Sequence, residues 1–85
     1  MEILKFYTET CMPCKVIGKM LDKLEGVKVT PVNAIADENI ELVSEYNIFS
    51  TPTLVFLKEG KEVGRITGMT NESKIKAILE ANETP

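Results

Sequence analysis

Residues 3–14 read ILKFYTETCMPC, and this stretch decides how the fold begins. Ile3 to Tyr7 is short, apolar and rich in β-forming side chains, which predicts a strand. Residues 8–10 predict a turn that leads into Cys11. Cys11 and Cys14, the two cysteines of the chain, therefore fall where this strand gives way to the next element.

A helix is predicted to begin at Pro13. The N–H groups of the first helical turn have no partner within the helix, so the N–H that proline lacks is not missed there. Apolar residues then recur at helical spacing and predict a face directed at the core, made of Val16, Ile17, Met20, Leu21 and Leu24. Gly26 is expected to end this helix, since glycine is common at left-handed helix caps.

The middle of the chain predicts a second strand and a second helix. Residues 27–32 have the composition of a strand, but Pro31 cannot donate a ladder hydrogen bond, so this strand is expected at a sheet edge. Asp37 or Asn39 is expected to cap the following helix. This helix is expected to direct Ile40, Val43 and Tyr46 inward and to end at Asn47.

The second half predicts a hairpin and a last helix. Residues 54–57 (LVFL) form a continuous apolar run, which indicates a strand covered on both faces. Residues 58–61 predict its hairpin turn, and residues 62–67 the returning strand, weakened by Gly64. Asn71 is expected to begin a helix that directs Ile75, Ile78 and Leu79 at the core, and residues 83–85 are expected to fray.

The element order is therefore β-α-β-α-β-β-α, which places the chain in the α/β class. The first half implies a parallel strand pair through a right-handed crossover, and the hairpin implies antiparallel pairing. We expect a four-stranded mixed sheet covered by helices on both faces. At 85 residues the chain is expected to form a single domain over residues 1–85.

Composition excludes several classes of function. Lys and Arg number 10 against 13 Asp and Glu, and a net charge of −3 disfavours a nucleic-acid binder. No apolar run approaches the ~18 residues of a membrane span, and the first residues do not resemble a signal peptide. The chain has no His, which excludes histidine acid–base catalysis and His-ligated metal sites. We expect a cytoplasmic monomer that needs no cofactor.

The cysteine pair is a poor structural staple and a good redox site. Closing a loop this short stabilises a protein by only ~2 kcal/mol. Side chains three apart on a helix have Cβ atoms ~5–6 Å apart, whereas a disulfide needs ~3.8 Å. A small adjustment of the first turn would suffice, so dithiol and disulfide suit nearly one backbone. The positive end of the helix dipole would stabilise a thiolate at Cys11. We therefore interpret Cys11 as the attacking thiolate and Cys14 as the resolving thiol.

The motif and the element order together resemble the thioredoxin family over roughly Ile3 to Leu79. The matching residues are 11–15 (CMPCK), 46–53 (YNIFSTPT), Gly60 and Gly68. The resemblance implies a minimal thioredoxin fold and thiol–disulfide exchange with protein disulfides, after which a separate thiol reductase recharges the pair. It also implies a cis Pro52 beside the cysteines.

The resemblance further implies where a substrate would bind. Thr51 would offer backbone hydrogen bonds to a substrate strand, and Gly68 would let a substrate backbone approach. Met12 and Pro13 lie between the cysteines and are also expected to contact substrate. Exposed apolar side chains at Met12 and Phe49 are expected to form a docking patch beside the disulfide.

The sequence departs from the family pattern in three places. The family's N-terminal β-α unit is not found in these residues. Lys5 stands where thioredoxins carry a buried acid, six residues before the first cysteine, and Thr10 stands where they carry tryptophan. A lysine ammonium near the sulfurs would favour thiolate and make the couple more oxidising. Because desolvating lysine is costly, we instead expect Lys5 to extend outward without affecting them.

Two other functions fit the cysteine pair. A metal-binding protein is one, although zinc needs about four ligands and two thiols would have to borrow the others. Residues 10–14 (TCMPC) also resemble the metal loop of copper(I) chaperones, but those proteins have a different element order. The second alternative is a thioredoxin-like adaptor that binds a partner while its thiols stay idle.

Overall fold

The computed structural model describes residues 1–82, so the fraying expected for residues 83–85 lies outside the described residues. The elements in chain order are β1 (Glu2–Tyr7), α1 (Met12–Asp22), β2 (Lys28–Asn33), the 3-10 turn η1 (Asp37–Asn39), α2 (Ile40–Glu45), β3 (Thr53–Lys58), β4 (Lys61–Thr67) and α3 (Glu72–Ala81). This order confirms the β-α-β-α-β-β-α prediction.

Within residues 1–82 the strands form one mixed sheet in the order β2-β1-β3-β4. β1 pairs with β2 in parallel, while β1 with β3 and β3 with β4 are antiparallel. The position of β2 at the edge confirms the prediction made from Pro31, which lies opposite Lys5 in the register. β3 lies between two strands, and its residues 53–57 are all buried.

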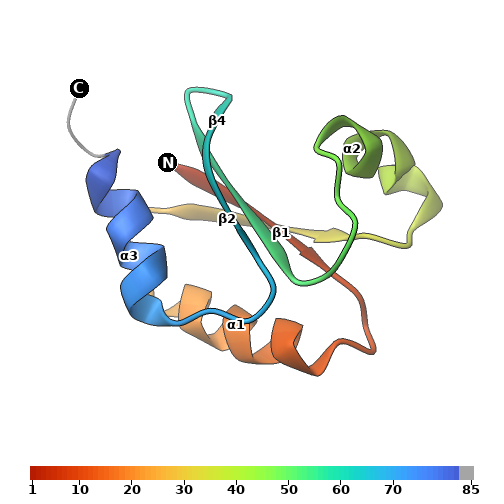
Figure 1. Cartoon of the computed structure of the whole chain (residues 1–85), viewed down its shortest axis with the longest axis horizontal. Helices are drawn as coiled ribbons and strands as arrows, with labels where there is room; N and C mark the ends of the chain where they lie inside the picture. Colours follow the sequence, from red (N-terminus) through yellow and green to blue (C-terminus); the bar gives the residue numbers. More distant parts are fainter. Residues whose placement is uncertain (83–85) are drawn as a thin grey trace.

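Apolar side chains form one core on each face of the sheet. Because side chains alternate along a strand, Ile3 and Leu4 belong to different cores. The first core joins the sheet to Ile17 and Leu21 of α1 and to Ile75 and Leu79 of α3. The second core packs against residues 42–48 in and after α2. Helices thus cover both faces, with α1 and α3 on one side and α2 on the other (Figure 1).

Two residues expected in the core are exposed. Val16 is 45% exposed, because α1 buries the stripe of Cys14, Ile17 and Leu21 and Val16 lies outside it. Ile40 is 61% exposed. It follows a 3-10 turn, whose tighter winding changes the phase of the helical face. Leu42, Val43 and Tyr46 make the core contacts from this part of the chain.

Helix ends also differ from the sequence pattern. The end of α1 at Asp22 corrects the expectation for Gly26. After the helix ends, the Leu24 N–H donates a hydrogen bond to the Leu21 carbonyl three residues earlier (N···O 3.0 Å). Gly26 lies in the following turn with φ +73°.

The two predicted caps differ: Asn39 occupies the N-cap position of α2 as predicted but without a capping hydrogen bond, whereas Asn71 caps α3 through its side chain. Neither Asp37 nor Asn39 caps a helix through its side chain. The Asn39 amide instead donates to the Asn33 carbonyl (3.0 Å), which ties the turn to the end of β2. Asn71 does cap α3, since its Oδ1 accepts a hydrogen bond from the Lys74 N–H (3.0 Å).

The hairpin between β3 and β4 uses two residues with positive φ. Glu59 has φ +53° and Gly60 φ +81°, the pattern of a two-residue turn that matches the strand twist. Gly64 has a role beyond the weakening that the sequence indicates. A Cβ atom on Gly64 would lie 2.9 Å from Cγ2 of Ile78, so the missing side chain lets α3 pack closely on β4.

Candidate active site

Cys11 lies at the boundary between the turn after β1 and the start of α1. Its N–H donates to the Thr8 carbonyl (N···O 3.2 Å), which closes the turn. Cys11 has extended backbone angles and occupies the N-cap position of α1, and Pro13 lies in the first turn as predicted. The N-cap position faces the N–H groups that the first helical turn leaves without partners, and these favour negative charge.

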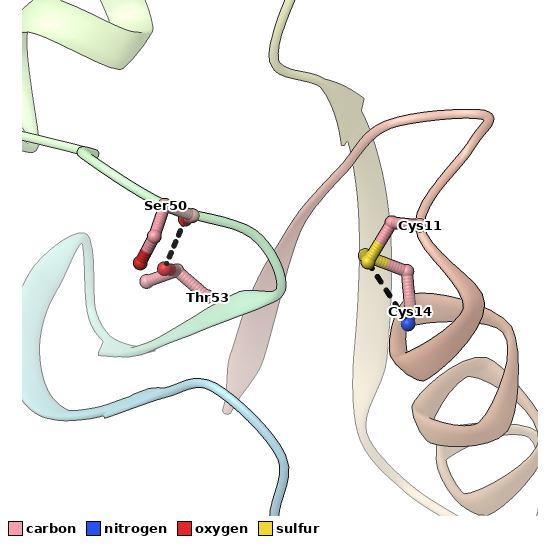
Figure 2. The surroundings of a disulfide bond; sticks show 4 residues. All are labelled: Cys11, Cys14, Ser50 and Thr53. Atoms are coloured by element: carbon pink, nitrogen blue, oxygen red, sulfur yellow. Dashed lines mark hydrogen bonds between the residues drawn. A yellow bond between two sulfur atoms is a disulfide. The ribbon is translucent and has the colours of Figure 1, made fainter.

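The two cysteines form a disulfide, with 5.3 Å between their Cα atoms (Figure 2). The backbone N–H of Cys14 donates to Sγ of Cys11, with an N···Sγ distance of 3.2 Å. Cys14 is 4% exposed, whereas Cys11 is only half-buried. Cys11 is therefore the more accessible of the two cysteines, and Cys14 is covered.

The loop before β3 reaches the same end of the sheet. Thr53, the first residue of β3, pairs with Phe6 near the end of β1, so residues 50–52 emerge beside the strand that leads to Cys11. The Thr51–Pro52 peptide bond is cis, as the family resemblance implied. The Thr53 hydroxyl donates to the Ser50 carbonyl (2.8 Å) and holds the loop around Pro52 (Figure 2).

The remaining predicted substrate residues divide into two groups. Gly68 is tied to the prolyl loop (residues 50–52), because its N–H donates to the Pro52 carbonyl (2.8 Å). Gly68 also adopts φ +85°, which favours glycine. Met12 and Pro13 lie on the first turn of α1 and are exposed, Met12 by 67%. Phe49 is 91% exposed, as the proposed docking patch requires.

The position of Lys5 differs from the sequence-based expectation. Its side chain is half-buried and lines a groove of about 520 Å³ together with Cys14 and Gly18. The Lys5 Nζ lies 5.5 Å from the centroid of the Tyr7 ring. The expected outward extension is wrong because Gly18 of α1 leaves space for the lysine between helix and strand.

Within residues 1–82, no three or more His, Cys, Asp or Glu side chains gather in an arrangement that could hold a metal ion. Among the same residues, none of the helices is both long and apolar enough to cross a membrane.

Comparison with known proteins identifies the family. The family model described as Thioredoxin matches residues 1–81. The chain belongs to the thioredoxin family. Thioredoxin-T of Drosophila melanogaster is 37% identical over 83 residues, which cover 92% of this chain and 51% of that protein. Thioredoxin of Echinococcus granulosus is 33% identical over 82 residues, which cover 94% of this chain and 76% of that protein.

The fold agrees with that of thioredoxins of known structure. The X-ray structure of Fasciola hepatica thioredoxin superimposes with a TM-score of 0.81 at 30% identity, over 96% of this chain and 80% of that one. The chain spans about half the length of the first curated relatives it matches, 51% of Thioredoxin-T and 49% of the mitochondrial thioredoxin of Mus musculus. The thioredoxin fold is thus present around the cysteine pair.

Sequence reasoning missed two residues at this site. Met69 is 55% exposed and follows Gly68, whose N–H donates to the Pro52 carbonyl, so Met69 adds apolar surface next to that contact. The sequence could have indicated Met69, because it is an apolar residue between Gly68, which follows a strand, and Asn71, which caps a helix. Gly18 was also missed, although a glycine inside a helical pattern usually has a packing reason.

Proposed function

We propose that this thioredoxin-family chain is a thiol–disulfide oxidoreductase that exchanges the Cys11–Cys14 pair with disulfides of other proteins. The observation that carries the proposal is the placement of the two sulfurs. Cys11 occupies the N-cap of α1 and is accessible, while Cys14 is 4% exposed one turn later. A nucleophile needs access and a stabilised thiolate, and a resolving thiol needs only proximity to its partner.

The reaction proceeds through a mixed disulfide. The Cys11 thiolate attacks one sulfur of the substrate disulfide, a Cys11–substrate bond forms, and the other substrate sulfur leaves and takes a proton from solvent. Cys14 then loses its proton and attacks the Cys11 sulfur. The Cys11–Cys14 bond forms as the Cys11–substrate bond breaks, so the substrate leaves with both sulfurs reduced.

The substrate is proposed to bind across the prolyl loop and the start of α1. Thr51 forms no backbone hydrogen bond with other residues in 1–82, which supports its role as a partner for a substrate strand. The hydrogen bond between Gly68 and Pro52 fixes the backbone next to Thr51, where the substrate strand would lie. Met12 and Pro13 supply exposed surface next to the reacting sulfur.

The wider setting also belongs to the proposal. A separate thiol reductase would return the disulfide to the dithiol, since each turnover leaves Cys11 and Cys14 oxidised. We propose that residues 1–85 act as a single domain, as a monomer and in the cytoplasm.

Two serine variants test the proposal. Cys11→Ser is expected to abolish reduction of a model protein disulfide such as insulin, with dithiothreitol supplying electrons. Cys14→Ser is expected to accumulate a covalent adduct between Cys11 and the substrate, visible on a non-reducing gel and lost on adding reductant. Undiminished reduction by Cys11→Ser, or an adduct formed equally well by Cys11→Ser, would contradict the assigned roles.

A further inference from the structure

Lys5 is held between β1 and α1. Because side chains alternate along a strand, Lys5 shares a face with Ile3, which is fully buried against α1. The Lys5 ammonium contacts the Tyr7 ring, 5.5 Å from its centroid, at a distance typical of cation–π pairs. Among residues 1–82 it forms no ion pair with a carboxylate.

Gly18 provides the space that the ammonium occupies. A Cβ atom on Gly18 would lie only 3.2 Å from Nζ of Lys5. Gly18 is four residues after Cys14, and such positions share one helix face with Cβ atoms about 5–6 Å apart. Helical side chains lean toward the helix N-terminus, so the space above Gly18 extends toward Cys14. The ammonium therefore lies beside the helix face that carries Cys14, and both residues line the same groove.

The groove around these residues has a positive charge that is concentrated on Lys5. Among residues 1–82, the groove is lined by five charged residues: Lys5, Glu9, Lys15, Lys19 and Asp22. Two further ionisable residues, Tyr7 and Cys14, also line it. The two carboxylates balance the two lysines of α1, so one positive charge remains. Glu9 and the three α1 residues are exposed, whereas Lys5 is half-buried. The field of Lys5 is therefore the least screened by solvent.

We propose that Lys5 is a positioning residue for the redox couple, whose fixed positive charge stabilises Cys14 as a thiolate in the reduced protein. This inference rests on the proposed thiol–disulfide exchange and adds an electrostatic control to it. Lys5 makes the couple more oxidising as the pH rises into the range where Cys14 ionises, because stabilising the reduced form favours reduction.

The ammonium acts without exchanging a proton. Before resolution, the Cys14 thiol gives its proton to solvent in the groove. The resulting thiolate attacks the Cys11 sulfur of the mixed disulfide and displaces the substrate thiolate, which takes a proton from solvent. A positive charge beside Cys14 raises the fraction of protein ready for this step.

The first test measures Cys14 alone. In a Cys11→Ser background, the rate of Cys14 alkylation by iodoacetamide is followed against pH for Lys5, Lys5→Met, Lys5→Gln and Lys5→Arg. Loss of the charge is expected to lower the thiolate-to-thiol ratio about threefold to tenfold, for a nearby charge that is partly screened by solvent. The alkylation profile would then move to higher pH in the Met and Gln variants and return toward the original in the Arg variant.

The control separates local charge from net charge. Lys28→Met removes an exposed lysine of β2 that does not line the groove, so it is expected to leave the profile in place. Identical profiles for Lys5 and both neutral variants would overturn the proposal, as would an equal shift in Lys28→Met. This outcome does not depend on turnover, so it is distinct from a failure of the oxidoreductase proposal in the insulin assay.

A second readout uses the intact couple. The equilibrium constant with glutathione is measured against pH for the unmodified chain and for Lys5→Met. The two are expected to agree at low pH, where Cys14 is protonated in both, and to diverge by up to about tenfold at high pH. A difference that is the same at every pH, or absent at every pH, would contradict an effect exerted through Cys14 ionisation.

Discussion

The backbone N–H of Cys14 donates a hydrogen bond to Sγ of Cys11, with 3.2 Å between the nitrogen and the sulfur. This contact joins the two cysteines in a second way besides the disulfide. The donor belongs to the first turn of α1, whose N–H groups have no partners within the helix. When the disulfide is reduced, the same N–H is positioned to stabilise negative charge on Cys11.

This geometry predicts that the two thiols differ in reactivity. In the reduced protein, Cys11 is expected to be alkylated by iodoacetamide at least about tenfold faster than Cys14 near neutral pH, because it is accessible and capped by N–H donors. Partial labelling followed by peptide mass spectrometry measures the two rates. Equal labelling, or faster labelling of Cys14, would contradict the assignment of the attacking thiol.

The prolyl loop predicts a contrast between two buried threonines. Thr53 is 2% exposed and its hydroxyl donates to the Ser50 carbonyl at 2.8 Å. Thr53→Val is therefore expected to lower the free energy of unfolding by about 0.5–1.5 kcal/mol, since the hydrogen bond that holds the loop is lost. Urea unfolding measures the change.

Thr70→Val is the matched control. The Thr70 hydroxyl is buried and has no hydrogen-bond partner in residues 1–82. Replacing it with a methyl group is expected to leave the free energy of unfolding unchanged or slightly raised, because no bond is lost and a buried polar group is removed. A loss as large as that of Thr53→Val would contradict the contrast.

Gly18 predicts a stabilising substitution. Gly18→Ala is expected to raise the free energy of unfolding by about 0.5–1 kcal/mol, because glycine inside a helix is less favourable than alanine. The added Cβ meets only the end of the flexible Lys5 side chain, at 3.2 Å, which can move by a few tenths of an ångström. Thermal unfolding tests this, and a destabilised variant would mean that the Lys5 ammonium cannot yield.

Gly64 predicts the opposite result. Gly64→Ala is expected to lower the free energy of unfolding by about 1–2 kcal/mol, since its Cβ would lie 2.9 Å from the branched Cγ2 of Ile78. The loss is expected to shrink when Ile78 is also changed to Ala, which removes the clashing methyl group. A double-mutant cycle measures the coupling, and additive effects would contradict direct contact.

The order of the elements could be predicted from the sequence because each depends on local signals. Pro31 indicated that β2 lies at the edge of the sheet, and the apolar run 54–57 indicated that β3 is buried within it. Asn71 marked the start of α3. The phase of the helical faces was less accessible. Ile40 was misplaced because the 3-10 turn before it depends on how the chain leaves β2, which local periodicity does not record.

The candidate site could be predicted in part for the same reason. Cys11 and Cys14 stand in a short motif at the start of a helix, whereas the cis bond at Pro52 was implied by the resemblance to the thioredoxin family. The position of Lys5 could not be predicted, because the cost of burying an ammonium argues for solvent and only the packing of Gly18 against β1 supplies the space. Contacts between residues distant in sequence decide such cases.

The most direct test of reversible thiol–disulfide exchange is the redox equilibrium of Cys11 and Cys14 in glutathione buffers of varied ratio. Acid quenching, alkylation and mass spectrometry would report the fraction of each form. The account predicts a single transition in which both thiols are lost together as one two-electron couple, reached equally from the reduced and the oxidised side. Thiols that stay reduced across the series, or that end only as stable adducts with glutathione, would contradict it.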